Sequence, residues 1–192
     1  MNNHLRDYID SGHTLVTANN RLARFLSHQY AEHQLKSNIT AWETPKILPW
    51  QSWLKEYWEQ QQFAKHGGLK LLSNNQQRCL WQQVIQSSAT AKQLLQVNSV
   101  IPLAIRSYEL CKSWCLPIFP DGYFLNDDVG VFKSWALEYE RQLEHRHWID
   151  YANLPDYLCR QPLLDDYRDS SVAFYGFDDY TPQQQKLTDY LK

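Results

Sequence analysis

The chain has 192 residues, enough for one domain or for one domain with a large insertion, and 43% of them are hydrophobic. Its formal net charge of −2 argues against a uniformly basic, nucleic-acid-coating surface but is compatible with a local basic patch. No apolar run approaches the roughly 20 residues of a membrane span, and the N-terminus lacks a signal-peptide core. We therefore expect a cytoplasmic protein without membrane contact.

Residues 13–18 are predicted to form a strand that leads through a turn into a helix. Asn19 or Asn20 can cap this helix. Its apolar positions recur at helical spacing: Leu22, Phe25, Leu26 and Tyr30. A strand–turn–helix unit of this kind places the free N–H groups of the helix at the end of the strand.

Arg21 and Arg24 lie in the first turn and a half of that helix. They are either contacts for an anion or a phosphate, or ordinary solvated arginines. The turn at residues 17–22 has neither the glycines nor the lysine of the nucleotide-binding loop G-x-x-x-x-G-K-[ST]. We therefore expect no ATP hydrolysis at this position.

A second strand is expected at residues 46–48, inside an extended stretch in which Pro45 and Pro49 disfavour a helix. Pro49 then opens a helix with an apolar stripe made of Trp50, Trp53, Leu54, Tyr57 and Trp58. A stripe at this spacing is either a core face or a platform for base stacking. We expect the core face.

Residues 69–161 are predicted to be helical throughout. Ser73 and Gln76 form a capping box for the first of these helices, and Asn98 or Ser99 begins a later one. That later helix carries apolar residues on several sides: Leu103, Leu110 and Trp114. We therefore expect it to be buried on more than one face.

A long helix is predicted to begin at Asn126 or Asp127 and to end at residues 145–147, where cations suit a helix C-terminus. Asp150 is expected to cap the helix that follows.

The four cysteines, Cys79, Cys111, Cys115 and Cys159, show no spacing typical of a disulfide scaffold. Cys111 and Cys115 are four residues apart, on one helix face, and could hold zinc together with a distant histidine. No second ligand pair follows at a finger-like spacing. We expect buried thiols, with no metal and no other cofactor.

Residues 171–175 are apolar throughout, as expected for a parallel strand covered on both faces. Thr181 and Gln184 then form a second capping box, with Pro182 at the first helical position. A parallel sheet with so few strands has an open edge, and the last helix is short. We therefore expect a fragment of a longer protein.

These elements predict an α/β fold that is predominantly helical overall, with a small parallel sheet and a large all-helical insertion. Residues 1–66 would form the first part of the α/β domain, and residues 67–168 would form the insertion. Residues 169–192 would supply the return strand and helix of the α/β domain.

Four segments are specific enough to indicate a family: residues 15–24 (LVTANNRLAR), 41–50 (AWETPKILPW), 147–155 (HWIDYANLP) and 176–185 (GFDDYTPQQQ). Together they resemble the N-terminal part of bacterial probable DNA repair proteins related to AddB and RecB, over nearly the whole chain. The resemblance implies the first domain of a superfamily 1 helicase-like region, of the P-loop NTPase type. In that family a much longer protein ends in a PD-(D/E)xK nuclease domain.

An active helicase of this superfamily has Asp-Glu at the end of the closing strand. Aligned on the shared threonine, Gly176 falls where the magnesium-binding Asp belongs and Phe177 where the catalytic Glu belongs, while Asp178 and Asp179 lie further along. The resemblance therefore implies a degenerate ATPase site with no catalytic residue. These 192 residues also lack the nuclease motif.

Three functions follow as alternatives. The first is a non-catalytic module of a DNA repair exonuclease that binds DNA or scaffolds a partner; its DNA-binding candidates are Asn19, Asn20, Arg21, Arg24 and Lys46. Its partners would be DNA, the remainder of the same chain and a helicase or nuclease subunit. The second is a protein-interaction domain without DNA contact. The third is an atypical nucleotide-binding enzyme that uses Asp178 and Asp179 on magnesium.

Overall fold

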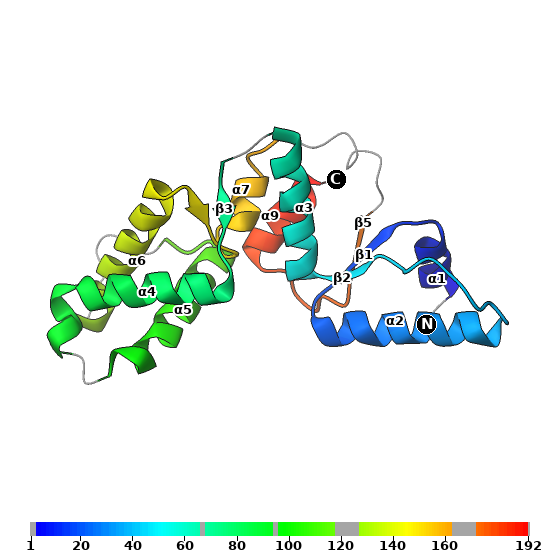
Figure 1. Ribbon diagram of the computed structural model, residues 1–192, viewed down its shortest axis with the longest axis horizontal. Helices are drawn as coiled ribbons and strands as arrows, with labels where there is room; N and C mark the ends of the chain where they lie inside the picture. The colour runs from blue at the N-terminus through cyan, green and yellow to red at the C-terminus, as the bar shows by residue number, and fades with distance from the viewer. Residues whose placement is uncertain (1–2, 66–67, 94–95, 118–126, 163–171, 192) are drawn as a thin grey trace. The chain divides into compact units, whose positions relative to one another are not determined.

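The computed structural model describes residues 3–65, 68–93, 96–117, 127–162 and 172–191, which fall into two compact units (Figure 1). We call residues 1–63, 162–180 and 191 the α/β unit, and residues 64–161, 181–190 and 192 the helical unit. The described residues are mostly helical and include a small three-stranded parallel sheet, which confirms the expected fold class at this level. Within the described residues no helix is long and apolar enough to cross a membrane.

A three-stranded parallel sheet forms the centre of the α/β unit. Its strands are β1 (Thr14–Thr17), β2 (Ile47–Pro49) and β5 (Val172–Tyr175), in the order β2-β1-β5. Leu15 of β1 therefore pairs with Ile47 on one side and with Ala173 on the other. All three strands are those that the sequence predicts.

Helices cover the two faces of this sheet. Helices α1 (Asn3–Asp10) and α2 (Asn20–Lys36) share an apolar cluster with the face that carries Leu15 and Ala173. Side chains alternate along a strand, so the next residue, Phe174, meets the opposite side. There it contacts Trp50 and Trp53 of α3 (Trp50–Lys65), with ring centroids 6.0 and 5.4 Å away. The aromatic stripe of α3 is thus a core face, as expected.

The helical unit is built from α4 (Asn74–Ser87), η1 (Ala89–Gln93), α5 (Val97–Ser113), α6 (Asp127–His145), α7 (Leu154–Leu158) and α9 (Pro182–Tyr190). A two-residue parallel pair joins β3 (Lys70–Leu71) to β4 (Trp148–Ile149). Three buried rings form the centre of its core. Trp81 stacks on Tyr139 at 4.3 Å, and Tyr108 meets Tyr139 edge-on at 5.3 Å.

Both predicted capping boxes form. Gln76 N–H is bonded to the Ser73 hydroxyl, and Ser73 N–H is bonded to the Gln76 side chain. Thr181 and Gln184 exchange the same two bonds at the start of α9. Helix α9 then packs against α5 and α7, within the helical unit. Residues 169–192, which were expected to belong to the α/β domain, are therefore divided between the two units after Tyr180. The expected boundary at 168/169 lies outside the described residues.

Exposure corrects several expectations. Helix α5 begins at Val97 without a side-chain cap, and Leu103, Leu110 and Trp114 are 65, 47 and 50% exposed rather than buried. Only the face of α5 that carries Ile101, Ala104 and Tyr108 enters the core, because its neighbours lie on that side. Phe25 of α2 is 55% exposed, because the core lies on the face of α2 that carries Ala23, Leu26 and Tyr30.

The cysteines are also less buried than predicted. Cys79 and Cys115 are exposed, and Cys111 and Cys159 are half-buried. Cys115 lies just beyond α5 with φ at 51°, so the helix has ended before it and the expected one-face pairing with Cys111 is lost.

Candidate functional site

The carboxyl ends of β1 and β5 lie side by side. The backbone N–H of Ala18 donates to the carbonyl of Tyr175 at 3.3 Å, which extends the pairing one residue past β1. From β1 the chain passes through α2 to β2 on one side, and β5 later pairs on the other side. The strand order thus reverses at β1, and ligands of open α/β sheets bind outside the strand ends at such a point.

Helix α2 begins at this sheet edge. Asn19 caps it, since its side-chain oxygen accepts from the backbone N–H of Leu22 at 2.9 Å. The buried Thr17 hydroxyl lies 3.1 Å from the Asn19 carbonyl, to which it donates, and so fixes the turn. Asn20, Arg21 and Arg24 then project from the first turns as exposed side chains. The structure therefore brings together four of the five predicted DNA-binding residues.

Lys46 lies elsewhere. It precedes β2, whose first residue Ile47 pairs with Leu15 near the start of β1. In a parallel sheet this places Lys46 at the amino end of the strands, about 10 Å along the strand direction from the edge where α2 begins. Lys46 therefore does not share an edge of the sheet with Arg21 and Arg24, and its role as a DNA contact stays a prediction.

Gly176 closes the same edge from the side of β5. Its φ is 74°, in the left-handed region, and a Cβ at this position would lie 2.2 Å from Cδ2 of Leu22. The backbone thus packs directly onto the first turn of α2. A side chain of any kind, an aspartate included, fits here only if Leu22 moves and the backbone strain is accepted.

The residues after Gly176 are not arranged as a metal site. Phe177 stacks on Tyr180 with ring centroids 4.9 Å apart and meets Trp50 edge-on at 6.0 Å. Asp178 and Asp179 are exposed. Within the described residues no group of three or more His, Cys, Asp and Glu side chains could hold a metal ion.

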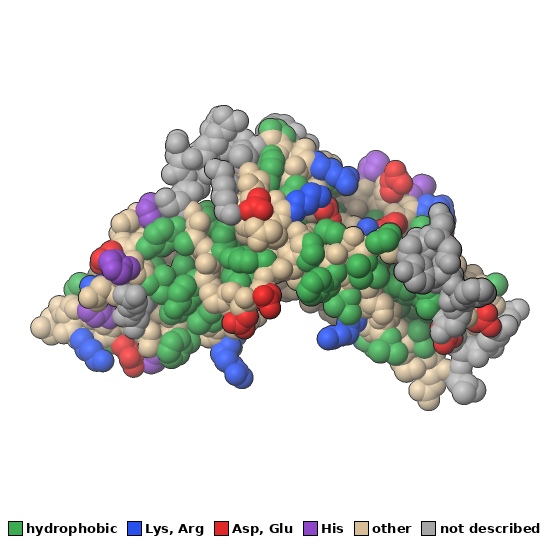
Figure 2. Space-filling view, turned by 180° about the vertical axis from the view of Figure 1, so that it is seen from behind, with side chains coloured by type: hydrophobic (Ala, Val, Ile, Leu, Met, Phe, Trp, Pro, Cys, Tyr) green, Lys and Arg blue, Asp and Glu red, His purple; other side chains and the backbone are tan. Residues whose placement is uncertain are grey.

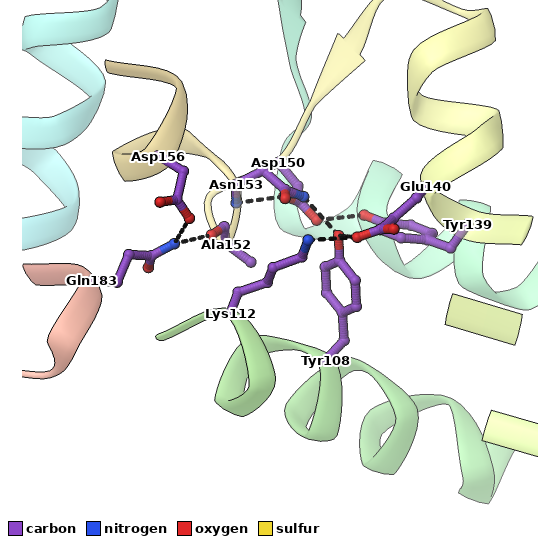
Figure 3. Close-up of polar contacts among 9 residues, drawn as sticks. All are labelled: Tyr108, Lys112, Tyr139, Glu140, Asp150, Ala152, Asn153, Asp156 and Gln183. Carbon is purple, nitrogen blue, oxygen red and sulfur yellow. Dashed lines mark hydrogen bonds and ion pairs between the residues drawn. The ribbon is translucent and has the colours of Figure 1, made fainter. Parts of the chain in front are cut away.

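A second polar centre, in the helical unit, surrounds Asp150 (Figure 3). This carboxylate is only 1% exposed and accepts a bond from the Tyr139 hydroxyl at 2.8 Å. It also accepts from the backbone and side-chain N–H groups of Asn153, at 3.0 and 2.8 Å. Burial raises the pKa of Asp150, and the bonds from Tyr139 and Asn153 oppose that shift.

Tyr108 links this centre to two helices. Its hydroxyl accepts from the Asn153 amide at 2.7 Å and donates to Glu140 at 3.1 Å. Glu140 also forms an ion pair with Lys112. Burial raises the pKa of Tyr108 and of Tyr139 above their usual range, so both are neutral donors. The network ties α5, α6 and the turn before α7 together.

A neighbouring cluster holds α9 to α7. The Gln183 amide donates to the Ala152 carbonyl and to Asp156, both at 2.8 Å (Figure 3). Lys186 pairs with Asp156 at 2.9 Å. Burial raises the pKa of Asp156, but the bonds from Gln183 and Lys186 outweigh it and leave a net lowering.

The sequence contained only one local signal for these two clusters. Asp150 was expected to cap the following helix, and it does accept from the N–H three residues later. The N-cap residue of α7 is nevertheless Asn153, which makes no side-chain cap bond. The role of Asp150 as partner of Tyr139 was missed, because nothing in the helical spacing of α6 indicates which residue its tyrosine meets.

The chain matches no protein-family model and no curated protein. The relationship to the AddB and RecB proteins therefore stays a prediction from the four sequence segments.

Proposed function

We propose that this chain is a non-catalytic, helicase-like module of the P-loop type from a DNA repair exonuclease related to AddB and RecB, and that it contacts DNA at the carboxyl edge of its sheet. The observation that carries the proposal is the strand reversal at β1, where α2 begins and presents Arg21 and Arg24 to solvent. This is the position at which open α/β sheets bind their ligands.

The same edge favours a phosphate backbone over a bound nucleotide. The turn has no glycine for close approach and no lysine. Asn19 also occupies one of the free N–H groups of α2 with its own side chain. Exposed arginines and an amide can still hold the phosphates of an extended strand, which need surface contact rather than an enclosed loop.

Gly176 supports the non-catalytic part of the proposal. The resemblance aligns it with the magnesium-binding Asp of active helicases. A carboxylate there would need a Cβ that lies 2.2 Å from Leu22. The backbone at Gly176 thus allows β5 to pack closely on α2, and this packing leaves no room for a magnesium-binding carboxylate at that position.

Fluorescence anisotropy with a labelled single strand tests the DNA contact. The double variant R21A/R24A is expected to weaken binding at low salt on the order of tenfold. Its log–log salt slope should be shallower by about 1.4, because two phosphate contacts are lost. K46A is the matched control, since Lys46 lies at the other end of the sheet. Salt-independent binding, or equal losses in R21A/R24A and K46A, contradicts the proposal.

A protein-interaction domain is the second candidate. Hydrophobic side chains reach the surface of the protein (Figure 2). Helix α5 exposes Leu103 and Leu110, and Trp114 at its C-cap is exposed as well. A surface that exposes several large apolar side chains is a common mark of a protein interface. If this function holds, L103S/L110S abolishes capture of the remainder of the same protein while DNA affinity is unchanged.

A further inference from the structure

Trp148 of the helical unit is surrounded by cations. It pairs with Lys70 across the β3–β4 ladder, so the two side chains lie on the same face. Lys70 Nζ is 5.9 Å and Arg146 Cζ is 4.9 Å from the centre of the indole ring. Ile149, the next residue, points into the core, whereas Trp148 is half-buried. Both cationic side chains are exposed and can therefore leave the ring.

Trp148 lines an open pocket of about 480 Å³, a size suited to a small organic ligand. Leu143 and Tyr157 add apolar and aromatic surface, and Arg160 adds a further cation. A ring platform beside several cations is what proteins use to hold the bases and phosphates of single strands.

Carboxylates also line this pocket. Those of Glu140 and Asp156 are neutralised by Lys112 and Lys186. In the part of the chain that the structure describes, Glu144 makes no ion pair. Its carboxylate is thus available as an acceptor, and acceptors of this type bond the exocyclic amino group of a base such as cytosine.

We propose that this pocket takes one unpaired nucleobase of a nucleic-acid strand, with a preference for a base that carries an exocyclic amino group. The base stacks on Trp148 and donates to Glu144. One of Lys70 and Arg146 leaves the ring as the base takes its face, and moves to a flanking phosphate. The inference rests on the proposed function, because it takes a nucleic-acid strand as the ligand, but it concerns a different unit from the sheet edge.

The test compares three strands of equal length, about 12 nucleotides: oligo-dC, oligo-dT and an abasic strand with the same charge. W148A should weaken oligo-dC binding by about tenfold and leave abasic binding unchanged. W148F keeps a stacking ring and should stay within about threefold of the unaltered chain. W114A is the control, because Trp114 is an exposed tryptophan at the C-cap of α5.

A second variant keeps the inference testable if W148A fails to fold. Glu144 is exposed, so E144Q should fold normally, and it should reduce the preference for oligo-dC over oligo-dT without changing abasic binding. The sheet-edge variant R21A/R24A should instead weaken all three strands equally.

The outcomes separate the two proposals. Equal losses for oligo-dC and the abasic strand in W148A, or an unaltered base preference in E144Q, overturn the base pocket and leave the sheet-edge contact standing. Tighter binding of a free deoxynucleotide than of any strand also overturns it. If the unaltered chain binds none of the strands, both proposals fall.

Discussion

The two units use polar side chains in opposite ways. At the sheet edge of the α/β unit, Asn20, Arg21 and Arg24 are exposed. In the helical unit Asp150, Tyr139 and Tyr108 are buried. The Tyr139 hydroxyl donates to Asp150, and the Tyr108 hydroxyl accepts from Asn153. Exposed polar groups can exchange water for a ligand at little cost, whereas buried ones are needed to hold the fold. Substitutions should therefore impair binding in the first unit and stability in the second.

The largest effect is expected from D150A. Removal of this carboxylate leaves the Tyr139 hydroxyl and two N–H groups of Asn153 without their acceptor. The free energy of unfolding should fall by about 3 kcal/mol, measured by urea denaturation with near-UV circular dichroism. D189A removes an exposed carboxylate of α9 and should change it by less than about 0.5 kcal/mol. Similar losses of unfolding free energy in both variants would show that the buried network contributes no more to stability than an exposed carboxylate does.

The next largest effect is expected at Gly176. This residue is an exception to the comparison between the units, because it lies at the sheet edge of the α/β unit but its substitution should change stability. G176A adds left-handed backbone strain and a collision with Leu22, and should destabilise the chain by about 2–3 kcal/mol. Gly12 has a similar φ of 78° but open space around it, so G12A should cost only about 1 kcal/mol.

A double-variant cycle isolates the collision. In an L22A background the obstructing side chain is gone, and the added cost of G176A should fall to that of G12A. Thermal denaturation of the four chains measures this. If the cost of G176A is unchanged by L22A, strain alone accounts for it and the close packing of β5 on α2 has no energetic weight.

A smaller effect should come from the helix caps. N19A removes the bond to the Leu22 N–H at 2.9 Å, and S73A removes half of the capping box of α4. Each should cost about 1 kcal/mol of stability. The two caps differ in function, because only N19A frees an N–H group at the proposed DNA contact. We expect N19A to change strand affinity and S73A to leave it unaltered.

The pH dependence of stability sharpens the comparison within the helical unit. The pKa of Asp150 is raised in the folded chain, so the folded state holds this proton better than the unfolded state. Relative to D150N, the chain should therefore gain stability as the pH falls through the raised pKa towards the unfolded value. The gain should be complete below the unfolded pKa.

Asp156 should behave in the opposite way. Its folded pKa is lowered, so its contribution is present above the unfolded pKa and is lost as the pH falls through the folded one. The stability differences from D150N and D156N, measured by urea denaturation between pH 3 and 7 on the order of one-unit steps, should slope in opposite directions. Parallel slopes would contradict the assigned environments.

Local features could be predicted from the sequence, and contacts between distant residues could not. The caps at Asn19 and Ser73 act over three residues, so spacing alone reveals them. The aromatic face of α3 follows from helical periodicity for the same reason. The Asn153–Tyr108 bond joins residues 45 positions apart, and no local pattern encodes it.

The exposure of a side chain was predicted wrongly where it depended on which helices or strands lie beside it. Leu103 and Phe25 have the residue type and spacing of core positions, but no described element covers them. The candidate site was predicted in part, since four of its five residues follow directly from the turn after β1. The separate position of Lys46 could not be read from the sequence, because strand direction decides which end of a sheet a residue occupies, and that requires the pairing.

The late position of β5 has a consequence for how the chain acquires its structure. Strand β1 lies at residues 14–17, yet one of its two partners begins at residue 172, and α9 of the helical unit begins at residue 182. During synthesis both units therefore wait for residues 172–190, and the side of β1 that pairs with β5 stays open until they emerge. Such long-range pairing slows folding and exposes strand edges to wrong partners. A chaperone or a cotranslational partner that shields β1 would thus act before the sheet is complete.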